Sequence, residues 1–321
     1  MNFGIIKTIS GVNKILLFGA NGYLGSNLVS FLDKHKYDIT IARRHGSLVT
    51  NSNFKHIDVF KYEKNILIDI LNNFDTIIYA SGANSRECEK NPDQTLISNL
   101  INPQKLIEAS INSNVSSFIY FSSIHVYSRE LKGKYNELSK TSNFHPYASY
   151  KIGIENYLKW CSEKSNLNII INRISNCYGF YDSSSNISWN LVVNEFCRSA
   201  ILNRCININS KFNSLRNYIS VTDFINILNF QLKNINSFSK DQVFNIVSST
   251  NLDLLGLANI ISKRCEIKYG FSPKINKSKD FNEFYDNIVF SNKKLLKHMN
   301  INFSSFEFEI DNLLDYTLNL Q

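Results

Sequence analysis

Tyr147 and Lys151 have residue types and a spacing that could do proton chemistry. Tyr147 is the one tyrosine of sixteen with a lysine four residues further on, and residues four apart share a helix face. Because a nearby ammonium lowers the pKa of a phenol, we expect the Tyr147 hydroxyl to exchange a proton near neutral pH. Interconversion of a carbonyl and an alcohol needs that proton transfer while a nicotinamide exchanges a hydride with carbon.

A glycine-rich turn near the start of the chain is typical of phosphate binding. Gly19, Gly22 and Gly25 are spaced as GxxGxxG, between an apolar run at 15–18 and a helical pattern. Glycine lets the main chain turn and lets a pyrophosphate approach, while free N–H groups at a helix start favour negative charge. A glycine triplet alone can also be a plain loop. In this context we predict dinucleotide binding, with contacts from Gly19, Asn21, Gly22, Tyr23, Leu24 and Gly25.

The end of the second predicted strand, 38–42, indicates which dinucleotide binds. In a sheet of this kind that position faces the adenosine ribose, where an acid binds both hydroxyls and arginine accommodates a 2′-phosphate. Arg43 and Arg44 follow the strand, whereas the nearby acid, Asp38, begins it and so lies at the wrong end. The arginines favour NADP(H), with NAD(H) possible. The alternative is that two arginines on an exposed turn are simply solvated.

Strand and helix patterns alternate along the first half of the chain. This alternation predicts an α/β fold with a Rossmann-type, doubly wound parallel sheet. Asp58 and Val59 close the third strand, where Asp58 could accept a hydrogen bond from the adenine amino group. The predicted strands cover 15–18, 38–42, 55–59, 75–80, 117–122 and 168–173, and the predicted helices cover 64–71, 92–110 and 147–161.

The alternation weakens after Cys177, which predicts a smaller, mixed C-terminal lobe. We expect an NAD(P)-binding domain at residues 1–176, with the chain returning to it at about 215–248, and a mainly substrate-binding lobe at 177–321. No long linker marks the boundary. Helical patterns in this part cover 190–202, 221–232, 252–263 and 306–318.

Composition favours a small anionic ligand over nucleic acid, metal or membrane. The formal net charge is +8, but the lysines and arginines are scattered rather than gathered in runs. The six cysteines have no CxxC spacing and the histidines are dispersed, so no metal site is expected. No apolar run approaches the roughly 18 residues of a membrane span. The first fourteen residues read as a short extension rather than a signal peptide, so we expect a cytoplasmic protein.

Seven segments, in order across roughly 14–224, resemble the extended short-chain dehydrogenase/reductases. The resemblance is to the NAD-dependent epimerase/dehydratase family, which acts on nucleotide sugars. Seven segments in register are far more specific than any one of them, whereas the last hundred residues match only loosely. The matching segments are Gly19-x-x-Gly22-x-x-Gly25, Ile77 to Ser81, Ser98-Asn99, Ser122 to Tyr127, Tyr147-x-x-x-Lys151, Arg173 to Gly179 and Arg216 to Asp223.

The resemblance implies three catalytic residues. Ser123 would hydrogen-bond the substrate oxygen, and Tyr147 would be the acid/base. Lys151 would hold the nicotinamide ribose and lower the pKa of the tyrosine. It also implies cofactor contacts from Ala80, Ser81 and Asn99, and substrate contacts from Ser123, His125, Asn176, Asn190 and Arg216. For Asn190 the alternative is a helix-start cap.

Departures from the family pattern narrow the reaction. Sugar 4,6-dehydratases carry Asp-Glu directly after the catalytic hydroxyl residue, where this chain has Ile124 and His125. Elimination of water is therefore not expected. His125 would donate to the sugar, or would be a loop histidine without a role.

The arginines after the second strand favour a reductase, because reductive biosynthesis draws on NADPH. We predict an NADPH-dependent reductase of an NDP-4-keto-6-deoxy sugar, of the kind that supplies deoxyhexoses for surface polysaccharide. The alternatives are an NDP-sugar 4-epimerase with tightly bound NAD and, as a minor reading, a non-catalytic dinucleotide-binding member. The family also suggests a homodimer through helices 92–110 and 147–161, although packing against their own sheet explains the same apolar stripes.

Overall fold

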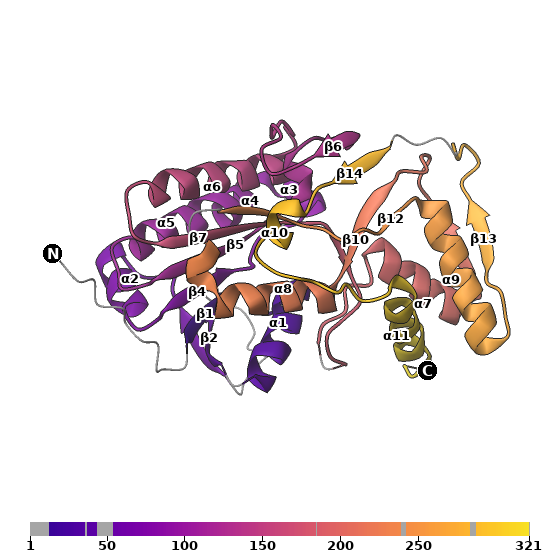
Figure 1. The fold of residues 1–321 in the computed structure, drawn as a ribbon, viewed down its shortest axis with the longest axis horizontal. Coiled ribbons are helices and arrows are strands. Elements are labelled where there is room, and N and C mark those ends of the chain that lie inside the picture. The colour runs from indigo at the N-terminus through magenta and orange to yellow at the C-terminus, as the bar shows by residue number, and fades with distance from the viewer. Residues whose placement is uncertain are drawn as a thin grey trace.

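The computed structural model describes residues 13–35, 37–43, 54–183, 185–238, 242–282 and 287–320. Arg44 and most of the N-terminal extension lie outside these residues. Within them, a large sheet with helices on both faces lies beside a smaller group of helices and short strands (Figure 1).

The large sheet has seven strands, all parallel, in the order β11-β7-β5-β4-β1-β2-β3. Winding reverses between β1 and β4, and ligands of doubly wound sheets bind at such a switch point, beyond the carboxyl ends of the strands. The Rossmann-type fold is thereby confirmed. The strands are β1 (Lys14–Phe18), β2 (Asp38–Arg43), β3 (Lys55–Asp58), β4 (Thr76–Tyr79), β5 (Ser117–Ser123), β7 (Asn168–Ile174) and β11 (Val243–Ile246).

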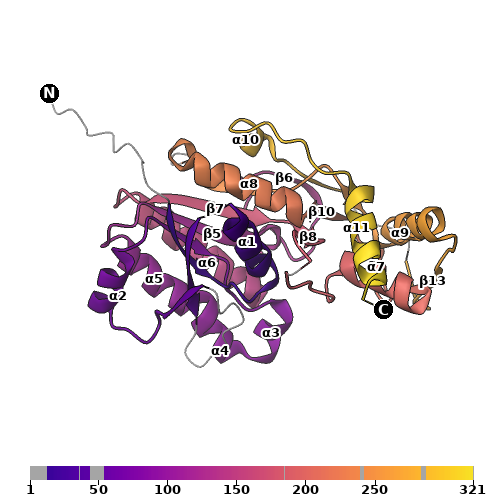
Figure 2. The same ribbon diagram turned by 90° about the horizontal axis from the view of Figure 1, so that it is seen from below.

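Helices cover both faces of this sheet, which is why β4 and β5 are buried along their whole length (Figure 2). The residues of one core come from α1 (Tyr23–Lys34) and α8 (Val221–Lys233) together with the sheet. The opposite core is built by α2 (Lys64–Leu71), α5 (Asn102–Ser110) and α6 (Pro146–Ser162).

The continuous helix predicted over 92–110 is wrong in one respect. It divides into α4 (Pro92–Leu96), a π-helical turn η1 (Ile97–Ile101) and α5. A π turn holds an extra residue and is frequent at functional sites. Here the turn buries the Asn99 side chain while Ile97 remains half exposed. A short helix α3 (Ser85–Lys90), which the sequence patterns did not predict, precedes it with a capping box of Asn84 and Glu87.

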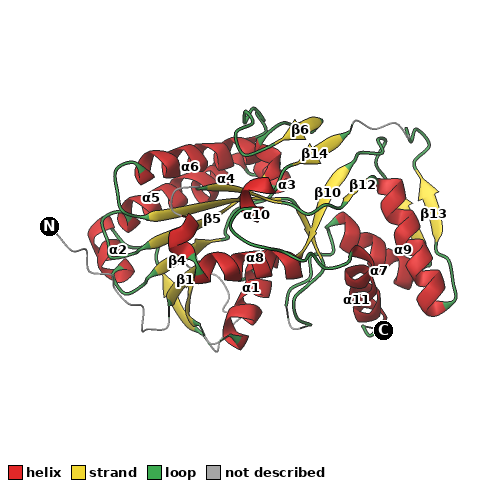
Figure 3. Ribbon diagram, viewed as in Figure 1, coloured by secondary structure: helices red, strands yellow, loops and turns green. Residues whose placement is uncertain are grey.

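The C-terminal region is mixed, as expected, with helices α7 (Val192–Asn203), α9 (Leu254–Tyr269) and α11 (Phe306–Leu318) around one core. Three small sheets accompany them (Figure 3). These pair β8 (Asn176–Tyr178), β10 (Arg216–Ser220) and β12 (Asn251–Leu252); β9 (Cys205–Ile208) and β13 (Lys274–Lys277); and β6 (Gly133–Tyr135) and β14 (Ile288–Phe290). Short helical turns are η2 (Ile124–Val126), η3 (Ile235–Phe238) and α10 (Lys293–Leu296).

The six cysteines are all free thiols, and five of them are buried. In the described part of the chain, no three His, Cys, Asp or Glu side chains gather as a metal site would require. The helices in the same residues are too short or too polar to cross a membrane.

Candidate active site

The turn after β1 brings main-chain N–H groups to the ligand side of the sheet. Gly19 has a φ of +86°, and the Gly22 N–H donates to its carbonyl at 2.9 Å. A Cβ on Gly19 would lie 2.7 Å from the main chain of Ala80 and Ser81, and a Cβ on Gly25 would lie 2.0 Å from the Gly19 carbonyl oxygen. Both positions therefore require glycine, because only glycine lets these segments approach so closely.

The N-terminus of α1 fits an anionic pyrophosphate. Gly22 is the N-cap, no side chain caps the first N–H groups, and no acid lies in the first turn. The first N–H groups of a helix have no partner within it, and the helix dipole favours negative charge there. The residues of the turn can thus hold the phosphates of a dinucleotide.

A pocket opens beside this turn at the ends of β1, β2 and β4. Arg43 lines it, as do Ala80 and Ser81, and the guanidinium Nε of Arg43 is buried without a hydrogen-bond partner in the described structure. Such an orphaned donor suits an anionic or hydroxyl-rich ligand. The complete lining is Phe18, Gly19, Ala20, Asn21, Gly22, Ile41, Ala42, Arg43, His56, Phe60, Ala80, Ser81 and Gly82.

Several other residues predicted to contact the cofactor are not part of the lining of this pocket. Asp58 and Val59 are buried at the end of β3 and are not part of the lining, and neither are Tyr23, Leu24 and Gly25. His56 and Phe60, which sequence reasoning missed, line it instead. The available signal for His56 was its place in β3, two residues before Asp58.

Asn99 supports the pocket from behind. Its Oδ1 accepts the Ala83 N–H at 2.7 Å, and its Nδ2 donates to the Ala83 carbonyl at 3.1 Å. The side chain is buried and also approaches Gly82, where a Cβ would lie 3.3 Å from Oδ1. Asn99 therefore holds the loop after β4, which itself lines the pocket.

Ser123, Tyr147 and Lys151 come together beyond the carboxyl end of β5. Ser123 ends β5, its Oγ accepts the His125 N–H at 3.2 Å, and it lies within hydrogen-bonding reach of the Tyr147 phenol. The Lys151 Nζ donates to the Phe121 carbonyl at 2.8 Å and lies 6.0 Å from the centroid of the Tyr147 ring. A hydroxyl and a phenol thus lie within hydrogen-bonding reach of each other with an ammonium beside the phenol ring, an arrangement able to bind and protonate a carbonyl oxygen.

The expectation that Lys151 lowers the pKa of Tyr147 is wrong for this structure. Burial raises the pKa of Tyr147, and the hydrogen bond with Ser123 opposes that rise only in part. Burial also lowers the pKa of Lys151 to about 8, against the opposing effect of Glu155. The phenol is therefore protonated at neutral pH, which is the form that gives a proton away.

Three of the predicted substrate residues also gather here. The imidazole of His125 is exposed to solvent but is hydrogen-bonded to Asn176, and its pKa is lowered by partial desolvation among the surrounding protein atoms and then by the charge of Arg216. The Asn176 Nδ2 donates to the Asn217 carbonyl at 2.9 Å, which fixes that side chain. Neutral imidazole, amide and guanidinium together form a polar surface rich in donors.

Asn190, the remaining predicted substrate residue, has no described contact with this group. It is exposed, and α7 begins two residues later at Val192 with Leu191 as the N-cap. The alternative that Asn190 caps the helix is therefore wrong, and no described contact links it to His125 or Arg216.

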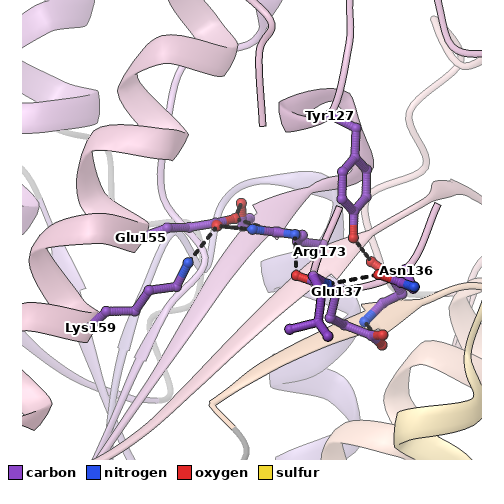
Figure 4. A network of polar contacts seen from close by, with 9 residues as sticks. Tyr127, Asn136, Glu137, Glu155, Lys159 and Arg173 are labelled. Carbon is purple, nitrogen blue, oxygen red and sulfur yellow. Dashed lines mark hydrogen bonds and ion pairs between the residues drawn. The ribbon is translucent and has the colours of Figure 1, made fainter. Parts of the chain in front are cut away.

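A buried ion pair behind the site was not predicted (Figure 4). Arg173, at the end of β7, contacts Glu155 of α6 with 2.6 Å between Nη2 and Oε2. The Ser122 hydroxyl donates to the same carboxylate at 2.5 Å. The available signal was the glutamate one helical turn after Lys151, on the same face.

Comparison with known proteins agrees with this architecture. Residues 15–247 match the model of the NAD dependent epimerase/dehydratase family. A dTDP-D-glucose 4,6-dehydratase of Dictyostelium discoideum is 24% identical over 253 residues, covering 69% of this chain and 56% of that protein. The chain spans just over half the length of the curated relatives it matches.

Two solved structures share the fold at low identity. MoeE5 in complex with UDP-glucose and NAD has a TM-score of 0.78 and 16% identity, covering 96% of this chain and 99% of that one. UDP-glucuronic acid 4-epimerase from Bacillus cereus, with UDP-glucuronic acid and NAD, has a TM-score of 0.77 and 20% identity, covering 96% and 100%. With the family model matched over more than half of the sequence, these results show that the chain belongs to the NAD-dependent epimerase/dehydratase family.

Proposed function

We propose that this chain is an NAD(P)-dependent enzyme that exchanges a hydride at a ring carbon of a nucleotide sugar. The convergence of Ser123, Tyr147 and Lys151 beyond β5, next to the glycine-lined pocket, carries the proposal. Relatives with this fold have been solved with UDP-sugars and NAD, which supports the same ligand classes here.

Each residue of the site has a defined task in this proposal. A bound nicotinamide supplies or accepts the hydride. Tyr147 gives its proton to the sugar oxygen or takes it back, and Ser123 donates a hydrogen bond to that oxygen. Lys151, buried beside β5, holds the nicotinamide ribose. His125, Asn176 and Arg216 face the rest of the substrate as donors, with Arg216 suited to the diphosphate.

Among reactions of this kind we favour reduction of an NDP-4-keto-6-deoxy sugar by NADPH, a step in deoxysugar synthesis. A phenol that keeps its proton is prepared to protonate a ketone oxygen. Arg43 in the pocket, at the end of β2, favours a 2′-phosphate. Dehydration is disfavoured, because the buried Ile124 stands where an acid would be needed.

A 4-epimerase that retains NAD is the second candidate. The observation in its favour is the match over almost the whole chain to a UDP-glucuronic acid 4-epimerase that binds NAD. An epimerase would use the same phenol first as base and then as acid, so the site geometry serves it as well.

One assay separates the two candidates. Purified protein is incubated with a panel of NDP-4-keto-6-deoxyhexoses and NADPH or NADH, and separately with unoxidised NDP-hexoses, while near-UV absorbance and sugar products are followed. NADPH oxidised in step with one ketone supports the reductase. Conversion of an NDP-hexose to its 4-epimer without net oxidation moves the chain to the epimerases.

Arg43 gives the reductase a second test. Arg43→Ala removes the guanidinium that would face a 2′-phosphate, so we expect the affinity for NADPH to fall about tenfold or more while that for NADH changes little. Lys55→Ala, at the start of β3, is the control for loss of one positive charge. Fluorescence titration with both cofactors measures the effect, and an unchanged preference would remove Arg43 as the selector.

A further inference from the structure

Glu155 is a carboxylate sealed inside the protein behind the proposed site. Its side chain is 1% exposed, and it belongs to α6, one turn beyond Lys151. A charge so completely removed from water is costly unless it is paired and hydrogen-bonded. The groups that bind this carboxylate therefore indicate its role in the structure.

Two strands hold this carboxylate. From β5 the Ser122 hydroxyl donates to Oε1, and Ser122 directly precedes Ser123. From β7 the Arg173 guanidinium donates through Nε at 3.1 Å to Oε1 and through Nη2 at 2.6 Å to Oε2. The carboxylate thus joins the helix that carries Tyr147 and Lys151 to the strand that carries Ser123.

Arg173 is itself held from other parts of the chain (Figure 4). Its Nη1 donates to the Glu137 carbonyl at 3.3 Å, and its guanidinium lies 4.8 Å from the centroid of the Tyr127 ring. The Tyr127 hydroxyl donates in turn to Asn245 of β11. The guanidinium that binds Glu155 is therefore itself fixed by contacts on its other side.

Lys151 has a defined set of neighbours that bear on its charge. From its own helix these are Tyr147 and Glu155; β5 contributes the ring of Tyr120, 4.8 Å from Nζ; and α3 contributes Cys88. Farther along, Arg173 and Lys159 face Glu155 rather than the ammonium, Lys159 at 4.0 Å. Of all these, Glu155 is the carboxylate.

We propose that Glu155 is a positioning residue for Lys151: clamped by Ser122 and Arg173, its carboxylate holds this turn of α6 against β5 and balances the buried ammonium. The proposal rests on the proposed function for the task of Lys151 at the cofactor. The electrostatic coupling between Glu155 and Lys151, however, can be measured without substrate turnover.

The coupling predicts that substitutions of Glu155 and of Arg173 shift the pKa of Lys151 in opposite directions. Glu155→Gln removes the negative charge, so the pKa of Lys151 should fall below its value of about 8, by about one unit. Arg173→Gln leaves Glu155 without its counter-ion, so the pKa of Lys151 should rise. A purely structural role predicts something else: loosened packing admits water, and both variants then move the pKa upward, toward that of an exposed lysine.

The experiment titrates Lys151 directly in the full chain without cofactor. Trace acetylation with acetic anhydride across a pH series, with the Lys151 peptide quantified by mass spectrometry, yields its pKa in wild type and variants. Asp311→Asn is the matched control, since it removes a carboxylate paired with Arg264 between α9 and α11, and it should leave Lys151 unchanged. Circular dichroism checks that each variant is folded.

A fall in Glu155→Gln together with a rise in Arg173→Gln supports the proposal. An unchanged or raised pKa of Lys151 in folded Glu155→Gln overturns it. If that variant does not fold, Arg173→Gln is compared with Ser122→Ala, which loosens the same carboxylate without removing a charge. A rise of the Lys151 pKa in Arg173→Gln that exceeds the one in Ser122→Ala supports the proposal, and any other result overturns it. Absence of turnover on any nucleotide sugar would count against the proposed function, but it would not change what the titration says about Glu155 and Lys151.

Discussion

Burial shifts the pKa values of Tyr147 and Lys151 in opposite directions. It raises the pKa of the Tyr147 phenol and lowers that of the Lys151 ammonium, because removal from water disfavours whichever form is charged. The phenol therefore holds its proton more tightly than the ammonium does, which reverses their ordinary order. Near neutral pH the proton resides on the phenol, and Lys151 loses its charge as the pH rises through about 8.

Tyr147→Phe tests the acid/base role. We expect kcat/KM to fall by about 10²- to 10⁴-fold, the usual contribution of a positioned acid or base, with cofactor affinity nearly unchanged. Tyr150→Phe, on the same turn of α6, is the control and should retain activity. Steady-state kinetics on the substrate identified by the panel measures both. An undiminished Tyr147→Phe variant would show that the proton comes from elsewhere.

At the scale of elements, the site depends on where strands end and helices begin. The end of β1, the loop after β4 and the start of α1 approach within contact distance at Gly19 and Gly25. The π turn η1 directs Asn99 inward to hold Ala83, which in turn sets the loop that lines the pocket. Positions of main-chain groups, more than of side chains, thus create the binding surface for a dinucleotide.

Two glycines at the same position of two helices provide a matched test. Gly25 and Gly256 are each the third residue after the N-cap, of α1 and α9. In Gly25→Ala the Cβ would lie 2.0 Å from a main-chain oxygen, whereas in Gly256→Ala it meets a side-chain oxygen at 3.4 Å. We expect Gly25→Ala to lose about 1–3 kcal/mol of stability and to weaken dinucleotide binding, and Gly256→Ala to be neutral or up to ~1 kcal/mol more stable.

Thermal or urea unfolding and cofactor titration of both alanine variants measure these effects. Equal behaviour of the two would mean that the turn after β1 can open at little cost. In that case the close approach of the main chain would not be what shapes the phosphate site.

At the scale of the whole molecule, two buried carboxylates lie where the large sheet region meets the C-terminal helices. Asp223 of α8 accepts hydrogen bonds from the N–H and hydroxyl of Ser304, just before α11. Glu309 of α11 is 2% exposed, and burial, with the charge of Asp223, raises its pKa. The junction is therefore sensitive to pH.

Glu309→Gln should make the protein more stable at pH 8 and change it little near pH 4. In wild type the unfolded chain releases this proton near its ordinary pKa of about 4.3, before the folded chain does, so stability falls as pH rises through that window. We expect a gain on the order of 1 kcal/mol at pH 8, the usual size of a single-site effect.

Urea unfolding at pH 4, 6 and 8 measures this dependence. Glu307→Gln, an exposed acid in the same turn of α11, controls for the loss of one charge. A Glu309→Gln variant whose stability parallels wild type at all three pH values would contradict the assignment. The homodimer expected from the helices at 92–110 and 147–161, and the domain division near residue 177, remain predictions at this scale.

Local patterns by themselves determined the order of the strands and helices, the glycine turn and the Tyr147–Lys151 pair, because turn chemistry and helical spacing act between near neighbours in the chain. The tertiary structure decided what depends on distant segments. It placed His56 in the pocket, made Leu191 rather than Asn190 the N-cap of α7, and buried Glu155 against Arg173. It also raised the pKa of Tyr147 where the spacing of the pair predicted a lower one. The reason is that desolvation depends on everything that surrounds a group, whereas a sequence motif contains only the group's nearest partner.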